Sequence, residues 1–167
     1  QRLQSLPQGG HIRILLLGDG ACKPDLQARA AKLALKNVVF VDTVPKDEVA
    51  RWWSLLDVSI IHLRKTDLFT AVIPSKLFEC MGMGIPVLHG VRGESADIVR
   101  RESVGEVFEP ENADELVDAL LRLGSDRDAL AVFRANGLAA AQRYDRVELA
   151  GEMLKVLQGT ADFSGPP

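Results

Sequence analysis

The 167-residue sequence has few cysteines, no long apolar run and no excess of basic residues, and each shortage excludes a class of protein. Cys22 and Cys80 have no metal-ligand spacing, which predicts reduced structural thiols and a cytoplasmic location. No stretch approaches the roughly 18 apolar residues of a membrane-spanning helix, and the opening QRLQSLPQGG does not have the pattern of a signal peptide. The 20 Lys and Arg are scattered and outnumbered by 23 Asp and Glu, so no nucleic-acid partner is expected.

Length and composition predict one compact domain. With 47% hydrophobic and 26% charged residues, the chain can bury a substantial core and is typical of a globular protein. We expect a lead-in at 1–10, the domain at 11–158 and a frayed tail at 159–167. The sequence starts without Met and enters an apolar run almost at once, so we expect it to be part of a longer protein.

Short apolar runs alternate with helical patterns along the chain. The run that ends at Gly18 is typical of a strand buried on both faces of a parallel sheet. An amphipathic helix is indicated where apolar residues follow the spacing i, i+3, i+4, i+7, at Val49, Trp52, Trp53 and Leu56. Strands are expected at 11–18, 37–42, 57–63, 85–90 and 105–109, and helices at 22–35, 74–84, 94–101 and from the capping-box-like pair Asn112 and Glu115 onward.

This alternation predicts an α/β fold with a doubly wound, mostly parallel sheet covered by helices on both faces. In such sheets ligands bind beyond the carboxyl ends of the strands. The loops after Gly18, Asp42, Leu63 and Gly90 are therefore expected to face the binding site.

The glycine turn Gly18-Asp19-Gly20 follows the first expected strand and precedes a helix. Backbone without side chains can approach a diphosphate there, and the helix start offers free N–H groups. A tight strand-to-helix turn with no ligand explains the same three residues equally well.

A second constellation opens the helix expected at 74–84. Ser75, Lys76 and the helix N–H groups together suit a phosphate or diphosphate. One turn further, the Glu79 carboxylate could accept hydrogen bonds from the two hydroxyls of a ribose. The alternative is an exposed Lys76–Glu79 ion pair of little energetic consequence. We favour the ligand because Glu79 stands among apolar neighbours, and a carboxylate is seldom buried without a partner.

A third candidate is the loop at the end of the fourth expected strand. Gly90 and Gly93 flank Arg92, and Glu94 begins the next helix. This loop could close over a sugar or a phosphate. A flexible connector has the same spacing, so both interpretations stay open.

The histidines and one basic pair are less informative. His11, His62 and His89 are isolated from one another and from the cysteines, so no metal site is predicted. His62 and His89 fall near the ends of strands, where we expect structural roles. Arg64 and Lys65 precede a loop at the expected binding face, either as phosphate contacts or as solvated charges.

The sequence resembles the C-terminal domain of glycosyltransferase family 4 in ordered segments: LLLGDG, NVVFVDTVPKDEV, LLDVSIIHL, PSKLFECMGMGIPVL, RGESADIV and GEVFEPENADEL. The match covers about residues 12–157, and PSKLFECMGMGIPV is most similar to members that build bacterial polysaccharides and amino-sugar glycans. The resemblance implies a GT-B-type enzyme with two Rossmann-like domains. This chain would be the C-terminal half, which binds a nucleoside diphosphate sugar, and transfer would retain anomeric configuration without a cofactor or an essential metal.

The resemblance also implies roles for individual residues. Glu79 matches the glutamate that holds the ribose hydroxyls, and Thr43 and Val44 match the loop that contacts the base. Ser75, Lys76 and Leu77 match the helix-start positions whose backbone meets the diphosphate. Gly18 and Gly20 match the turn beneath the donor.

Three departures from the family pattern affect these expectations. Ala71 stands where the family usually has a sugar-binding glutamate, so other groups must recognise the donor sugar. Asp42 replaces a glycine common after the second motif strand. The family's first strand of this domain, with its basic pair that clamps the diphosphate, would lie upstream of His11, and nothing in residues 1–10 matches it.

The expected function is transfer from a nucleoside diphosphate sugar, with UDP-sugar favoured over GDP-sugar, to a glycan or lipid-linked acceptor held by an N-terminal domain. The isolated chain is expected to be inactive, and the whole enzyme to be cytoplasmic or peripheral to the inner face of the membrane. Two alternatives remain: a non-hydrolysing nucleotide-sugar epimerase, and a module that binds a nucleotide without chemistry.

Overall fold

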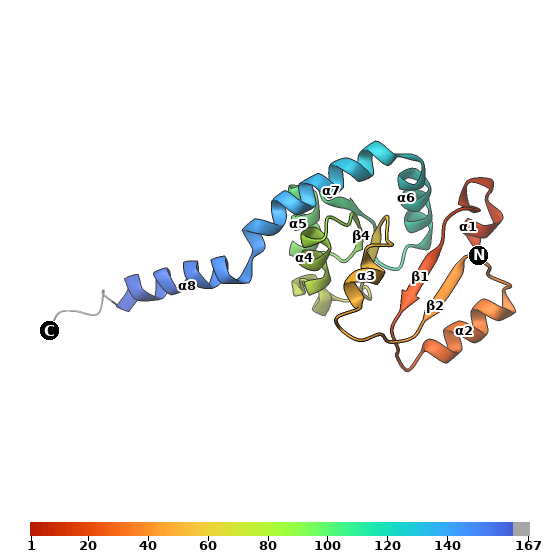
Figure 1. The fold of residues 1–167 in the computed structure, drawn as a ribbon, viewed down its shortest axis with the longest axis horizontal. Helices are drawn as coiled ribbons and strands as arrows, with labels where there is room; N and C mark the ends of the chain where they lie inside the picture. Colours follow the sequence, from red (N-terminus) through yellow and green to blue (C-terminus); the bar gives the residue numbers. More distant parts are fainter. Residues whose placement is uncertain (162–167) are drawn as a thin grey trace.

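The computed structural model describes residues 1–161, which form an α/β domain followed by a projecting helix (Figure 1). The strands are β1 (Ile14–Leu17), β2 (Val38–Val41), β3 (Ser59–His62), β4 (Val87–Gly90) and β5 (Gly105–Val107). The α-helices are α1 (Arg2–Ser5), α2 (Lys23–Lys32), α3 (Val49–Trp53), α4 (Ser75–Gly82), α5 (Glu94–Glu102), α6 (Ala113–Ser125), α7 (Arg127–Ala141) and α8 (Arg146–Ala161), with 3-10 turns η1 (Pro7–Gly9), η2 (Asp67–Ala71) and η3 (Gln142–Tyr144).

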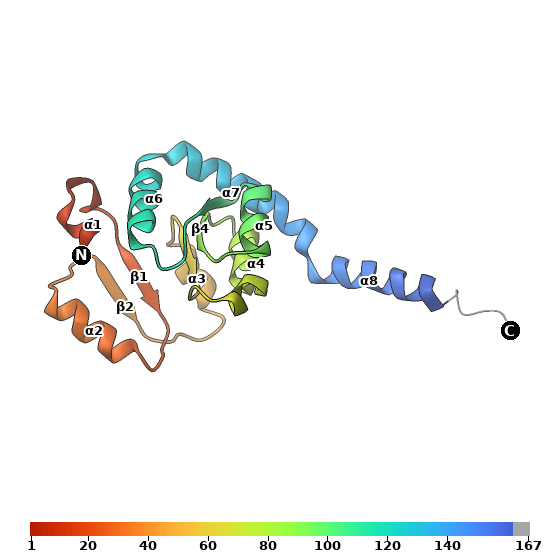
Figure 2. The ribbon, with the colours of Figure 1, turned by 180° about the vertical axis from the view of Figure 1, so that it is seen from behind.

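All strand pairs are parallel, which confirms the expected α/β class, but the strands form two sheets instead of one. β1 pairs with β2, and β3, β4 and β5 pair in that order. Figures 1 and 2 show β1 on the side of its sheet that faces the second sheet. Within the described residues, β1 has no strand partner except β2, and β3 has none except β4. The sheet is therefore interrupted between β1 and β3.

The core lies on the three-stranded sheet. Side chains of β4 alternate between its two faces, as a strand requires: Val87 packs with one buried cluster and Leu88 with the other. The first cluster takes Leu77, Cys80 and Met81 from α4, and burial raises the pKa of the Cys80 thiol. The helices α4 and α5 thus cover one face, and α6 covers the other.

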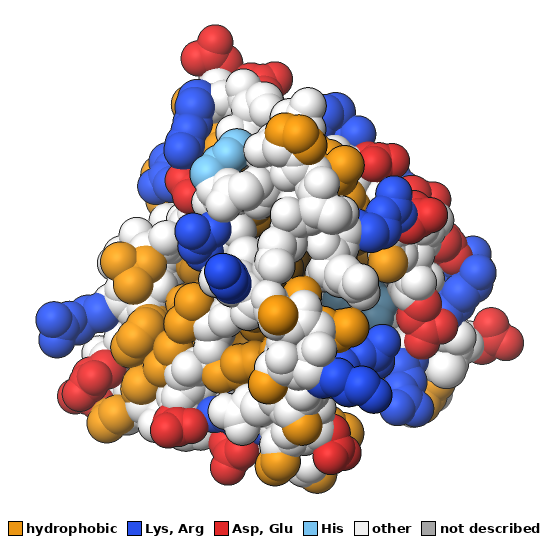
Figure 3. All heavy atoms as spheres, turned by 90° about the vertical axis from the view of Figure 1, so that its right-hand side faces the viewer, with side chains coloured by type: hydrophobic (Ala, Val, Ile, Leu, Met, Phe, Trp, Pro, Cys, Tyr) orange, Lys and Arg blue, Asp and Glu red, His pale blue; other side chains and the backbone are white. Residues whose placement is uncertain are grey.

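The two-stranded sheet is covered less completely. Leu16 in β1 and Val39 in β2 remain 41% and 44% exposed, although strands of parallel sheets are usually buried on both faces. Figure 3 shows hydrophobic side chains gathered on the side of the molecule that carries β1, β2 and α2.

Local signals in the sequence explain several element boundaries. Asn112 caps α6, because its side-chain oxygen accepts from the backbone of Asp114 and Glu115, and its side-chain Nδ2 donates to the Glu115 carboxylate. The expected stripe on 49–56 is only partly helical, since α3 ends at Trp53, but Trp53 and Leu56 do pack against the core.

Helix α8 extends away from the domain (Figures 1 and 2). It carries exposed apolar side chains that include Val147, Met153 and Val156. The helix covers the first part of the tail expected at 159–167, and residues 162–167 lie outside the described part of the chain. None of the helices in residues 1–161 has the length and apolar content needed to cross a bilayer.

Candidate functional site

The glycine turn after β1 and the loop after β2 are joined by a lysine. The Lys23 ammonium donates to the carbonyls of Gly18 at 2.8 Å and Val41 at 3.1 Å, and to the Asp42 carboxylate at 2.6 Å. Its hydrogen bond and charge lower the pKa of Asp42. All donors of this ammonium are used, so Lys23 holds the two strand ends together. Lys23 is not among the site residues predicted from the sequence, and its place at the start of the helix after the glycine turn is the signal that could have identified it.

A pocket of about 390 Å³ opens beside this junction. Its lining consists of Asp19, Lys23, Pro24, Gln27, Asp42 and Thr43. The structure therefore brings the expected residues Asp19 and Thr43 together, while Val44 is half-buried and does not line the pocket. Gly18 has φ of +128°, and a Cβ at Gly18 or Gly20 would meet no atom within 4 Å. The space above the turn is open to a ligand.

The start of α4 presents its polar groups to solvent. Ser75, Lys76 and Glu79 are exposed, whereas the Leu77 side chain is fully buried. The Leu77 N–H already donates to the Pro74 carbonyl at 3.0 Å. The N–H groups of Ser75 and Lys76 make no hydrogen bond within the described chain, so they are the donors that the helix start offers.

The expectation that Glu79 is buried was wrong. Helix α4 turns Leu77, Cys80 and Met81 into the core, at spacings of three and four residues, and Glu79 falls on the opposite side. Among the described residues the Glu79 carboxylate makes no hydrogen bond or ion pair, and the alternative Lys76–Glu79 pair does not form. Its oxygens are thus free to accept hydrogen bonds from a ligand.

The loop between β4 and α5 is tightly packed. A Cβ at Gly90 would lie 2.4 Å from the Phe108 ring, and one at Gly93 would lie 2.0 Å from the Thr70 carbonyl oxygen. Gly93 also has φ of +82°, which favours glycine. These contacts argue against a flexible connector and seat the loop on the segment that contains η2. Arg92 and Glu94 on this loop are exposed.

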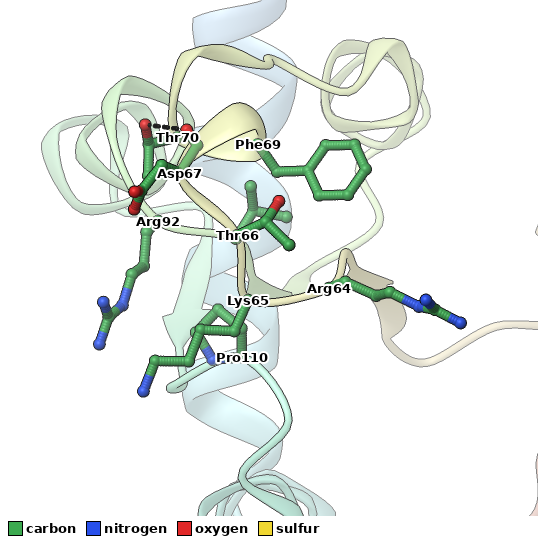
Figure 4. Close-up of a pocket in the computed structure, with 9 residues that line it drawn as sticks. Arg64, Lys65, Thr66, Asp67, Phe69, Thr70, Arg92 and Pro110 are labelled. Atoms are coloured by element: carbon green, nitrogen blue, oxygen red, sulfur yellow. Dashed lines mark hydrogen bonds between the residues drawn. The ribbon is translucent and has the colours of Figure 1, made fainter.

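A second pocket, of about 220 Å³, lies between this loop and the segment after β3 (Figure 4). It is lined by Arg64, Lys65, Thr66, Asp67, Phe69, Thr70, Val91, Arg92 and Pro110. Lys65 and Arg92 both bind the Glu109 carboxylate, at 2.8 and 2.5 Å. Hydrogen bonds from Lys65 and then Arg92 lower the pKa of Glu109. Arg64 points away from these two side chains (Figure 4).

The histidines near strand ends have structural contacts. His62 Nε2 accepts from the Glu111 N–H at 3.0 Å, and the His62 ring stacks on Phe108. His89 is fully buried, with Nε2 2.5 Å from the Ser95 hydroxyl oxygen, and burial lowers its pKa to about 4. Residues 1–161 contain no group of three or more His, Cys, Asp or Glu side chains able to hold a metal ion.

A family model described as Glycosyl transferases group 1 matches residues 1–126. The chain belongs to this glycosyltransferase family. Several solved glycosyltransferases of the GT-B type share its fold. No curated protein matches the sequence.

Three of these structures illustrate the relation of this glycosyltransferase chain to whole enzymes. Alr3699/HepE from Anabaena, in complex with UDP-glucose, is similar at a TM-score of 0.75 and 20% identity over 95% of this chain and 43% of that one. Sucrose-phosphate synthase from Thermosynechococcus elongatus has a TM-score of 0.70 and 20% identity over 91% and 39%. WaaG, a glycosyltransferase involved in lipopolysaccharide biosynthesis, has a TM-score of 0.67 and 19% identity over 84% and 37%. The chain therefore spans about two fifths of their length.

Proposed function

We propose that this chain is the donor-binding half of a two-domain glycosyltransferase that uses a UDP-sugar. The observation that carries the proposal is the start of α4. There an exposed carboxylate without a protein partner, Glu79, lies one helical turn beyond two free N–H groups and the Lys76 ammonium. An acceptor carboxylate suits vicinal ribose hydroxyls, and a helix start with a lysine suits a diphosphate.

The other strand ends supply the rest of the proposed donor site. Thr43 and Asp19 line the pocket beside the glycine turn, where we place the base, and half-buried Val44 follows Thr43 in the same loop. Gly18 and Gly20 leave space for the donor above the turn. The Ser75 and Lys76 N–H groups would face the diphosphate, with the Leu77 backbone next to them but already bonded to Pro74, and Gly90 to Glu94 would lie nearer the sugar. Negative charge develops on the diphosphate as the glycosidic bond breaks, so donors already in place stabilise the leaving group.

The choice of uridine is supported by the solved complexes of Alr3699/HepE with UDP and with UDP-glucose. We further propose retaining transfer without an essential metal, because a front-face reaction needs neither a metal nor an enzymic nucleophile.

The acceptor would be a glycan or a lipid-linked glycan of bacterial polysaccharide synthesis, held by an N-terminal domain. The enzyme would work in the cytoplasm, in solution or at the inner face of the membrane. The chain by itself would bind donor without turnover.

Calorimetric titration of the chain with UDP, GDP and AMP tests the site, at millimolar ligand because the proposed N-terminal domain is not in the sample. We expect preference for UDP, and at least tenfold weaker binding in Glu79→Ala, since two hydrogen bonds to a charged acceptor are lost. Glu152→Ala on α8 is the matched control, because Glu152 is also exposed and helical. Unchanged UDP affinity in Glu79→Ala would remove the ribose assignment, and preference for GDP would replace the donor.

A further inference from the structure

One wall of the pocket of about 220 Å³ carries two cationic side chains, and both are bound by a carboxylate that lies outside the pocket. Lys65 and Arg92 line the pocket, whereas Glu109, which binds both of them, does not. Arg92 uses Nε and Nη2 for Glu109, at 3.1 and 2.5 Å. Figure 4 shows Lys65 and Arg92 extending toward the same side. Glu109 thus positions two cations that come from different loops.

Both cations keep unused hydrogen-bond donors. A guanidinium has five N–H donors and an ammonium has three. Glu109 takes two from Arg92 and one from Lys65, which leaves the Nη1 and Nη2 edge of Arg92 free to hold a second carboxylate in a bidentate pair. The side chains are about half exposed, at 52% and 47%, so a ligand can reach them.

The rest of the lining is suited to hydroxyl groups. Asp67, Thr66 and Thr70 are exposed polar residues on the η2 side, and Figure 4 shows Asp67 and Thr70 together at the end of the pocket away from Lys65. Buried Val91 adds apolar surface. The volume is below the roughly 300 to 1,000 Å³ of sites for drug-sized ligands, so the pocket accommodates one ring rather than a whole nucleotide sugar.

The walls are also fixed in place. Gly93 presses its backbone against the Thr70 carbonyl, so the loop that carries Arg92 and the segment that carries Asp67 meet at van der Waals contact. A site whose groups are already positioned loses less entropy when a ligand binds.

We propose that this pocket binds a sugar acid, with Lys65 and Arg92 on the carboxylate and with Asp67 and the threonine hydroxyls on the ring hydroxyls. Binding of the sugar acid follows from the pocket alone. Its role as the transferred or accepting sugar of the enzyme rests on the proposed function. A neutral sugar would leave the free edge of Arg92 unpaired and would bind more weakly.

The test is an NMR titration of the 15N-labelled chain with D-glucuronate, D-glucose and D-glucose 6-phosphate. We expect saturable shifts of the Lys65, Thr66 and Arg92 amides with glucuronate, and affinity at least tenfold lower for glucose. Added salt should weaken glucuronate binding, because the cations are near the surface. Equal affinity for glucose, tighter binding of glucose 6-phosphate or absence of these shifts would each overturn the proposal.

Variants distinguish binding of glucuronate in this pocket from a general effect of surface charge. Arg92→Gln and Lys65→Gln should each weaken glucuronate binding about tenfold or more. Arg122→Gln is the matched control, because Arg122 forms a similar exposed pair with Glu106 outside the pocket. Unchanged glucuronate affinity in Arg92→Gln would contradict the assignment. Titration of the same samples with UDP distinguishes the two proposals: UDP binding without glucuronate binding rejects only the sugar-acid pocket, and the reverse rejects only the donor site.

Discussion

Lys23 shows how one side chain can hold two strand ends together at the edge of a pocket that it also lines. Its ammonium binds the carbonyl of Gly18, just after β1, the carbonyl of Val41, the last residue of β2, and the Asp42 carboxylate, so the residues after both strands are held side by side. Asp42 departs from the family pattern that the sequence resembles, and in this chain it is the ionic partner of Lys23. The departure noted in the sequence therefore has a structural explanation.

His89 makes the stability of the domain depend on pH. Burial keeps this imidazole neutral until the pH approaches its folded-state pKa of about 4, whereas the unfolded chain binds the proton near pH 6.5. Stability is therefore complete above pH 6.5 and falls as pH decreases from about 6.5 to about 4. We expect His89 to account for a loss of about 3 kcal/mol of unfolding free energy across that range.

Urea unfolding at several pH values measures this dependence, and NMR titration of the His89 ring gives its pKa directly. The His89→Gln variant removes the titrating group and should show a shallower decline in stability between pH 6.5 and 4. An NMR pKa near 6.5, or an identical decline in His89→Gln, would contradict the prediction.

Glu79 and the helix-capping pair Asn112 and Glu115 show which properties of single residues can be predicted from the sequence. Asn112 and Glu115 behave as their spacing indicates, because a cap depends on neighbours within three residues. The predicted burial of Glu79 was wrong because it rested on apolar neighbours in sequence, whereas burial on a helix depends on which face meets the sheet. Its position two residues after Leu77 was the available signal.

At the scale of elements, the contact between η2 and α5 shapes the proposed sugar pocket. Gly93→Ala would place a methyl group against the Thr70 carbonyl and would force alanine into a positive φ. We expect a loss of about 2 kcal/mol or more in unfolding free energy. Thermal or urea unfolding measures it, with Gly82→Ala in α4 as the control, because a Cβ there meets nothing within 4 Å. A Gly93→Ala protein as stable as the parent would refute this account.

A polar cluster between α5 and η3 holds the segment that precedes α8. The Glu102 carboxylate is 8% exposed and binds Tyr144 at 2.8 Å, as well as Arg101 and Arg143. Burial by itself raises the pKa of Glu102, but the hydrogen bonds from Tyr144, Arg143 and Arg101 outweigh it and lower the pKa. The Tyr144 ring also contacts Phe78 of α4. This cluster holds the end of α7 against the core where the chain turns into α8.

At the scale of the whole molecule, the interrupted sheet leads to a prediction that rests on the proposed two-domain enzyme. We propose that a strand from outside residues 1–167 pairs between β1 and β3 and completes one continuous sheet. In a longer chain, hydrogen exchange should be slower at amides of β1 and β3 than in the chain alone, because their open edges would gain partners. The β4 amides, which lie between two strands in both cases, are the internal control. Equal exchange at β1 and β3 in both chains would rule out this placement.

The sequence alone determined the α/β alternation, the parallel strands and the loops that line the two pockets, because periodicity and turn residues act over a few neighbours. Only the tertiary structure decided that Glu79 is exposed, that Lys23 joins two strand ends, and that Lys65 and Arg92 meet on Glu109. Those contacts join residues separated by up to 44 positions. Their geometry depends on how loops far apart in sequence pack at one edge of the sheets.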